Sequence, residues 1–119
     1  MNYKTLLFEV QKEIPEFGKK YKEALQKDLI DKESGMHTVF SYVFNPLLSE
    51  AIKKDQQLAK RMFNFVEKMA ESPDKYVQEV CDFTILEEIG DEYADKEFVN
   101  FLGPTTKKAL KLIRQYIID

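Results

Sequence analysis

Apolar residues recur at intervals of three and four along most of this chain, which is the spacing of one face of an α-helix. Between residues 57 and 91 two such patterns meet at the short junction Ser72-Pro73-Asp74. The apolar positions are Leu58, Met62, Phe65, Val66 and Met69 in the first arm, and Tyr76, Val77, Val80, Cys81, Ile85, Leu86 and Ile89 in the second. The pattern predicts a helical hairpin that turns at this junction.

The four prolines divide the rest of the chain, and each stands before a helical pattern: Pro15, Pro46, Pro73 and Pro104. Proline suits the first turn of a helix, because its φ is already helical and its missing N–H is not needed there. Inside a helix it costs about 3 kcal/mol or more. We therefore expect helices to begin near these prolines, and we expect Pro46 to break or kink the helix that starts near Met36.

The same periodicity predicts further helices over residues 3–14, 16–31, 36 onward, 92–102 and 104–118. The residues expected to face inward are Tyr3, Leu6, Leu7, Val10 and Ile14; Phe17, Tyr21, Leu25 and Leu29; Val39, Phe40, Val43, Phe44, Leu47, Leu48 and Ile52; and Ala109, Leu110, Ile113, Tyr116 and Ile117. No stretch alternates with period two for long enough to form a strand. The sequence thus predicts one all-α domain over residues 1–119 with about seven helices, either a compact right-handed stack of helix pairs or an irregular bundle.

Residues 72–81, continued by residues 86–91, resemble the turn and second helix of a HEAT repeat. Gln78 stands where that family usually carries a basic residue, and Ser72 where it favours aspartate. The resemblance covers under a third of the chain and implies stacked helix pairs. The regular spacing of the prolines agrees with it, although prolines at the helix starts of an irregular bundle would be spaced similarly.

A second resemblance lies at residues 101–108, where a Leu-Gly-Pro-x-Thr segment from Leu102 to Thr106 precedes a basic amphipathic helix. This arrangement is similar to a family of small, uncharacterised bacterial all-helical domains. That family implies a fold rather than an activity, so the resemblance assigns no catalytic residue. Ordinary helix signals, a glycine stop followed by a proline start, give the same pattern.

Composition indicates a folded globular protein. The 119 residues are 44% hydrophobic, and 18 basic residues nearly balance 21 acidic ones, for a net charge of −3. The longest apolar run is too short to span a bilayer, and we expect neither a secretory signal nor a membrane location. A single cysteine, Cys81, agrees with the reducing cytoplasm that we expect as the location.

The sequence offers few residues for catalysis. His37 is the single histidine, which excludes zinc sites built from two imidazoles. Cys81 falls at an apolar position in the middle of a predicted helix, where cysteine usually acts as a small buried hydrophobe rather than as a nucleophile. The four glycines are scattered and form no phosphate-binding loop. We expect no cofactor, no metal and no catalytic residue.

Acidic residues gather between positions 82 and 97, where seven carboxylates accompany a single lysine, for a local charge of about −6. An EF-hand is excluded, because Lys96 and Leu102 occupy the positions of its glycine and its bidentate glutamate. The alternatives are a solvated surface at a helix turn and a site for a basic partner. The residues predicted to bind that partner are Glu87, Glu88, Asp91, Glu92, Asp95 and Glu97.

The last predicted helix carries the opposite charge, with Lys107, Lys111 and Arg114 at helical spacing. We do not expect nucleic-acid binding, because a net charge of −3 lacks the broad basic surface that it requires. These cations are expected to be solvated or to face the acidic segment within the fold.

Two classes of function are compatible with these residues. The favoured one is a non-enzymatic protein-binding module, such as an immunity or antitoxin protein, whose acidic surface covers a basic site of a protein partner. The alternative is a small helical enzyme or ligand-binding domain centred on His37, with Phe40 and Tyr42 beside it. A pocket that holds His37 beside a carboxylate would favour the second class.

Overall fold

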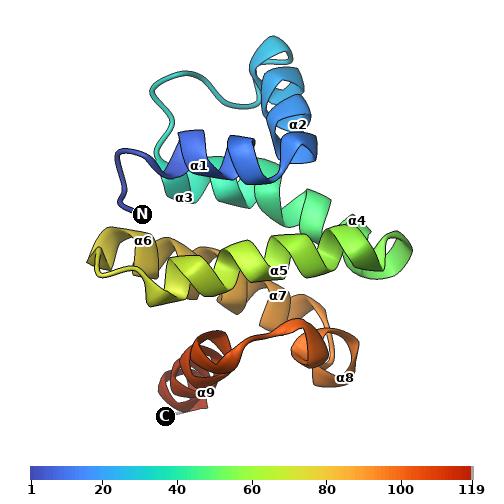
Figure 1. Ribbon diagram of the computed structural model, residues 1–119, viewed down its shortest axis with the longest axis vertical. Helices are drawn as coiled ribbons and strands as arrows, with labels where there is room; N and C mark the ends of the chain where they lie inside the picture. The colour runs from blue at the N-terminus through green and yellow to red at the C-terminus, as the bar shows by residue number, and fades with distance from the viewer. Residues whose placement is uncertain (119) are drawn as a thin grey trace.

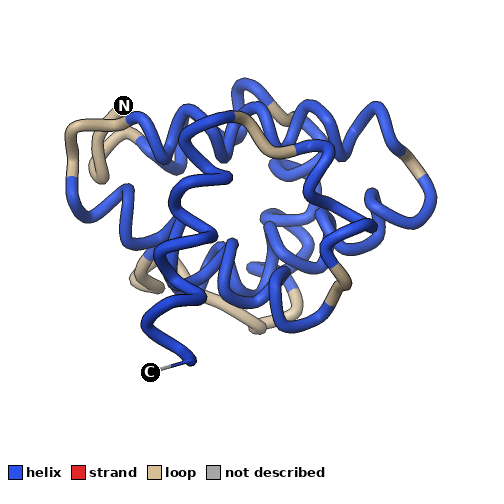
Figure 2. The backbone as a smooth tube through the Cα atoms, turned by 90° about the horizontal axis from the view of Figure 1, so that it is seen from below, coloured by secondary structure: helices blue, strands red, loops and turns tan. Residues whose placement is uncertain are grey.

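The structure, a computed structural model, describes the backbone of residues 1–118 and the side chains of residues 1–115, and this part of the chain is helical apart from its connections (Figures 1 and 2). The helices are α1 (Leu6–Glu13), α2 (Pro15–Gln26), α3 (Met36–Val39), α4 (Asn45–Lys54), α5 (Gln56–Glu71), α6 (Lys75–Glu79), α7 (Glu87–Glu92), α8 (Asp95–Phe98) and α9 (Pro104–Ile118). Two π-helical segments, η1 (Phe40–Phe44) and η2 (Val80–Leu86), and a 3-10 turn, η3 (Val99–Phe101), complete the set.

The all-α prediction is confirmed. Because α3, η1 and α4 follow one another without a break, as do α6, η2 and α7, and η3 continues α8, residues 1–118 form seven continuous helical segments and no strand. The inward positions expected at Leu110 and Ile113 are buried. Those expected at Tyr116 and Ile117 lie outside the described side chains.

Helix α5 lies at the centre of the molecule. Figure 1 shows it crossing the middle, with α1, α2 and α3 on one side and α8 and α9 on the other. It contacts α4, α6, η2, η3 and α9. A helix with neighbours on several sides must be apolar around most of its circumference. The residues of α5 that are buried are Leu58, Ala59, Met62, Phe63, Phe65, Val66 and Met69.

The predicted hairpin turn at Ser72-Pro73-Asp74 is confirmed, and it also fastens the start of the chain. The Asp74 carboxylate caps α6 by accepting the Tyr76 N–H at 2.9 Å, and its other oxygen accepts the Tyr3 N–H at 2.8 Å. The Ser72 hydroxyl donates to the Met1 carbonyl at 2.7 Å. Pro73 therefore precedes the capping residue of α6 and is not its first helical residue.

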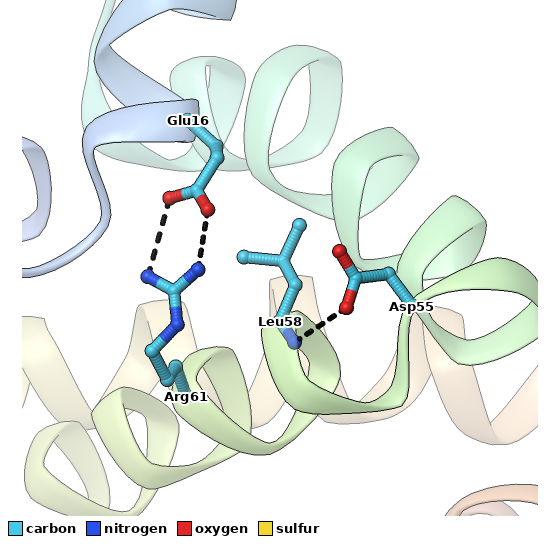
Figure 3. A network of polar contacts seen from close by, with 4 residues as sticks. All are labelled: Glu16, Asp55, Leu58 and Arg61. Atoms are coloured by element: carbon cyan, nitrogen blue, oxygen red, sulfur yellow. Dashed lines mark hydrogen bonds and ion pairs between the residues drawn. The ribbon is translucent and has the colours of Figure 1, made fainter.

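Two carboxylates fix the start of α5 and join it to α2 (Figure 3). Asp55 caps α5, because its side chain accepts the Leu58 N–H at 3.1 Å. Glu16, in the first turn of α2, forms a two-pronged ion pair with Arg61 of α5. The hydrogen bond from Arg61 lowers the pKa of Glu16 below its ordinary value. Both partners are solvent-exposed in part, so this pair orients the helices more than it stabilises them.

Pro46 was expected to break or to kink the helix that contains it. The helix is not broken there. It continues to Lys54, and the π segment η1 ends directly before Asn45. The Asn45 N–H bonds the Phe40 carbonyl, five residues back, so the hydrogen-bond register has shifted just before the proline. This shift accommodates a residue without an N–H while the chain stays helical.

The expectation that Leu29 faces inward is wrong. Helix α2 ends at Gln26, and Asp28 has φ 57°, a left-handed conformation that interrupts helical periodicity. Leu29 therefore points into solvent, and Ile30 is buried in its place.

The expectation that Cys81 is a buried packing residue is confirmed. Its side chain is fully buried within η2, and burial raises the pKa of its thiol well above the ordinary value. A thiol with a raised pKa holds little thiolate at neutral pH, so Cys81 is poorly suited to act as a nucleophile.

Candidate functional site

The acidic residues of α7 divide into two rows on different faces of that helix. Glu87 and Asp91 are four residues apart and share one face, and Glu88 and Glu92 share another. Glu87 lines a groove toward α9, whereas Glu88 and Glu92 line a groove toward α4. Asp91 is exposed and lines neither groove. The structure therefore does not gather the predicted partner-binding residues on a single face.

The remaining two carboxylates of the predicted set have partners within the fold. Asp95 forms a two-pronged ion pair with Arg114 of α9, with 2.7 Å between Asp95 Oδ2 and Arg114 Nη1. This contact confirms that a cation of the last helix faces the acidic segment, and the Arg114 hydrogen bond lowers the pKa of Asp95. Glu97 accepts the Ala94 N–H at 3.0 Å and so caps the start of α8.

A groove with a mostly apolar lining runs between η2 and α9 and has a volume of about 500 Å³; we call it the apolar groove. Two large apolar side chains in it are exposed: Phe83, with 58% of its surface accessible, and Leu112, with 49%. Large exposed apolar side chains that gather in one groove are typical of binding surfaces. The groove is lined by Ala70, Gln78, Asp82, Phe83, Glu87, Thr105, Lys108, Ala109, Leu112 and Ile113.

The apolar groove contains a carboxylate without a cationic partner. Asp82 is half-buried, and burial raises the pKa of its carboxyl above the ordinary value. No Lys or Arg side chain of the described residues forms an ion pair with it, although Lys108 also lines the groove. A carboxylate in such surroundings is stabilised by a ligand that brings a cation.

The position of α9, which forms one wall of the apolar groove, is set by Glu67 of α5. Its carboxylate accepts the backbone N–H groups of Thr105 at 3.0 Å and Thr106 at 2.8 Å. The Thr106 hydroxyl lies 2.9 Å from the same carboxylate. These are the unpaired N–H groups of the first turn of α9, so a side chain of α5 caps that helix.

The Leu-Gly-Pro-x-Thr segment acquires a structural role from this contact. Pro104 begins α9, and Thr106 is fully buried against Glu67. A Cβ atom on Gly103 would lie 2.5 Å from the Glu67 carboxylate carbon, so only glycine leaves room for the cap. The segment therefore joins α9 to α5, and its resemblance to other helical domains concerns the fold.

A second groove, with a polar lining, lies between α4 and α7 and has a volume of about 690 Å³; we call it the polar groove. Ser41, Asn45 and Ser49 form one wall at intervals of four residues, and Glu88 and Glu92 form the other. Ser41 Oγ donates to Glu88 at 2.9 Å, and Ser49 Oγ donates to Glu92 at 2.9 Å. Two of the six predicted acidic residues are thus paired across this groove.

Sequence reasoning missed three of the residues that shape these grooves. Phe83 lies off the buried face of its helix, and a large apolar residue there was a signal of a binding surface. Asn45 and Ser49 continue a polar row at four-residue spacing that begins at Ser41. That row predicts a polar contact with a neighbouring helix.

The residues proposed for an enzyme site do not line a common groove. His37 is exposed, and its Nδ1 lies 2.5 Å from the Thr84 hydroxyl. Phe40 is fully buried against Phe17 and Phe44, whereas Tyr42 is exposed. None of the three lines the apolar or the polar groove.

In the part of the chain that the structure describes, no group of three or more His, Cys, Asp or Glu side chains is arranged to hold a metal ion. Likewise, no described helix combines the length and the apolar content needed to cross a membrane.

These features define a small all-α domain in which the apolar groove lies on one side of α7 and the polar groove on the other. The model of a family described as a domain of unknown function (DUF7674) matches residues 8–117, and the chain belongs to this family. No curated protein and no solved structure matches the chain. The expectation of an uncharacterised family is therefore confirmed, whereas the bacterial origin and the likeness to HEAT repeats stay predictions.

Proposed function

We propose that this chain is a non-enzymatic protein-binding module whose apolar groove receives an amphipathic, basic helix of a partner protein. The observation that carries the proposal is the pair of exposed apolar side chains, Phe83 and Leu112, in a groove of about 500 Å³. An amphipathic helix places its own apolar residues in such a groove at intervals of three and four. An immunity or antitoxin protein is one role that fits this mode of binding.

The acidic residues beside the groove support a basic partner. Among the side chains that the structure describes, Asp82 forms no ion pair with a cation, and Glu87 lies in the same groove. A lysine or arginine of the bound helix would pair with them as the apolar contact excludes water. Asp91 extends the acidic row beyond the groove and would steer the partner during association.

The proposal is tested by selecting helical peptides that bind the protein from a display library in which charge and apolar spacing vary independently. We expect the selected peptides to share apolar residues at helical spacing and an excess of Lys and Arg. Replacement of Phe83 and Leu112 by serine should weaken their binding at least about tenfold, because buried apolar anchors carry most of the affinity of such interfaces.

The matched control for this double variant is Phe8→Ser, because Phe8 is also an exposed phenylalanine, 67% accessible, but lines neither groove. It should leave peptide affinity unchanged. All variants should keep the thermal unfolding of the native protein within a few degrees, since exposed side chains contribute little to stability. Equal loss of binding in the control, or no loss in the double variant, would rule out the apolar groove as the site.

Charge reversal at Asp91, the exposed member of this acidic row, should slow association. Changing it to lysine is expected to reduce the association rate several-fold while the dissociation rate changes less, because exposed charges act mainly on the encounter. Raising the ionic strength from about 0.01 M to about 0.15 M should diminish this difference, since the screening length falls from about 30 Å to about 8 Å. Surface plasmon resonance measures both rates. Equal association rates at low salt would contradict a steering role for this row.

A further inference from the structure

We propose that two copies of this chain associate about a two-fold axis through the surface around Leu29 and Tyr42. Leu29 lies in the turn that follows α2, and Tyr42 lies within η1. Both line a third groove, between α2 and the continuous helix of η1 and α4, with a volume of about 170 Å³; we call it the α2 groove. Figure 1 shows α2 and α9 at opposite ends of the molecule, so the inference does not depend on the function proposed above.

The first argument is that this surface exposes large apolar side chains. Leu29 has 60% of its surface accessible, and Tyr42 has 61%. Pro46 is exposed in the same groove, and the buried side chains of Val43 and Leu47 also line it. Exposed apolar side chains that gather beside a buried apolar lining are typical of protein contact surfaces.

The second argument is that the backbone holds Leu29 in its exposed position. Asp28 ends α2 in a left-handed conformation, with φ 57°, at a place where glycine is the usual residue. The Leu29 N–H then bonds the Ala24 carbonyl at 3.0 Å, back in α2. Because this turn is fixed before binding, association through Leu29 does not have to order a loop.

The size of the α2 groove indicates what it receives. Pockets for small organic ligands usually measure about 300–1,000 Å³. A volume of about 170 Å³ is smaller than that range, so the groove suits a single side chain inserted by another protein chain. Leu29 of a second copy is such a side chain.

The charges of the α2 groove favour an identical surface as the partner. Its lining contains two cations and two carboxylates, so neither an acidic nor a basic partner would match it. The four residues are Lys20, Lys27, Glu23 and Glu50. Lys20 and Glu23 pair with each other at 3.8 Å, whereas Lys27 and Glu50 form no ion pair among the side chains that the structure describes.

A two-fold axis gives Lys27 and Glu50 partners of opposite charge. In such a contact, residue i of one copy meets residue j of the other, and j meets i in return. Lys27 of each copy can therefore pair with Glu50 of the other, and the two contacts form together. Since the whole chain carries a net charge of −3, a surface with balanced charges is also where two copies meet with little repulsion.

The test is sedimentation equilibrium of the full-length protein from about 1 µM to about 1 mM, which covers the affinities of weak, transient contacts. We expect a reversible equilibrium between monomer and dimer. Replacing Leu29 and Tyr42 together by serine should weaken dimerisation at least about tenfold, because both apolar anchors are lost. The control Phe8→Ser removes an equally exposed side chain that lines none of the three grooves, and it should leave dimerisation unchanged.

Charge reversal tests the two-fold arrangement itself. Lys27→Glu and Glu50→Lys should each weaken dimerisation several-fold, because like charges then meet at both contacts. An equimolar mixture of the two variants should dimerise about as well as the native protein, since positions 27 and 50 carry opposite charges across the mixed dimer. Thermal unfolding verifies that every variant is folded.

Three results would overturn the proposal. A native protein that is monomeric at about 1 mM would leave this surface to a different protein. A dimer that survives the loss of Leu29 and Tyr42 would place the contact elsewhere, for example at the apolar groove. Charge variants that fail to recover dimerisation when mixed would exclude the pairing of Lys27 with Glu50 across a two-fold axis.

Discussion

Replacing Phe40 by alanine is expected to lower the free energy of unfolding by about 3–5 kcal/mol, a large share of the total stability of a domain of this size. Phe40 is fully buried, and its ring centroid lies 5.9 Å from that of Phe17 and 5.0 Å from that of Phe44. These rings join α2 to η1, so the variant loses both packing and aromatic contacts.

Tyr42→Ala is the matched control, because Tyr42 belongs to the same π segment but is exposed. It should change the free energy of unfolding by less than about 1 kcal/mol. Urea denaturation followed by circular dichroism measures both variants. A loss below about 1 kcal/mol for Phe40→Ala would contradict the burial of Phe40 in the core. It would also reopen the interpretation of Phe40 as part of a ligand-binding site.

Gly103→Ala should destabilise the protein by about as much as removal of the Glu67 side chain, and the two losses should not add. The added methyl group would occupy the position of the Glu67 carboxylate, so the carboxylate must swing away and give up its contacts with Thr105 and Thr106. Each single variant is expected to cost about 2 kcal/mol, which is typical of a lost charged cap. In the Glu67→Ala background the methyl group no longer meets a carboxylate, so Gly103→Ala should add less than about 0.5 kcal/mol.

The pH dependence of this cap follows from the pKa of Glu67. Burial alone would raise it, but the N–H donors of Thr106 and Thr105 outweigh burial and lower it below its ordinary value of 4.5. A carboxyl whose pKa is lower in the folded state stabilises the protein above its unfolded pKa, and this contribution disappears as the pH falls through the folded pKa. The stability difference between the native protein and Glu67→Gln should therefore be largest near neutral pH and shrink below about pH 4.5.

Two outcomes would contradict the role of Gly103 and Glu67. Additive losses in the double variant would show that the methyl group and the carboxylate do not compete for the same space. A stability difference that is independent of pH would show that the charge of Glu67 does not act on α9.

The helices and the turn at Ser72-Pro73-Asp74 could be predicted because their signals are local. Apolar spacing, a capping aspartate and a helix-starting proline each act within a few residues. The end of α2 could not be predicted in the same way. Its left-handed residue is Asp28, whereas the glycine that marks a stop in the sequence comes later, at Gly35.

The division of the acidic segment depends on which helices lie beside it, and sequence alone does not provide that. Consecutive residues of a helix point about 100° apart, so Glu87 and Glu88 face different neighbours. The sequence shows that acidic residues accumulate between positions 82 and 97. It does not show that α9 lies on one side of α7 and α4 on the other. The partners of Asp95 and Asn45 come from helices far away in sequence for the same reason.

The most direct test of the proposed binding mode is the location of a selected basic, amphipathic peptide on the ¹⁵N,¹³C-labelled protein. The account predicts that intermolecular nuclear Overhauser effects connect apolar side chains of the peptide with Phe83, Ala109 and Leu112, and that a lysine or arginine of the peptide lies beside Asp82. Contacts confined to another surface, such as that around Phe8, would contradict it.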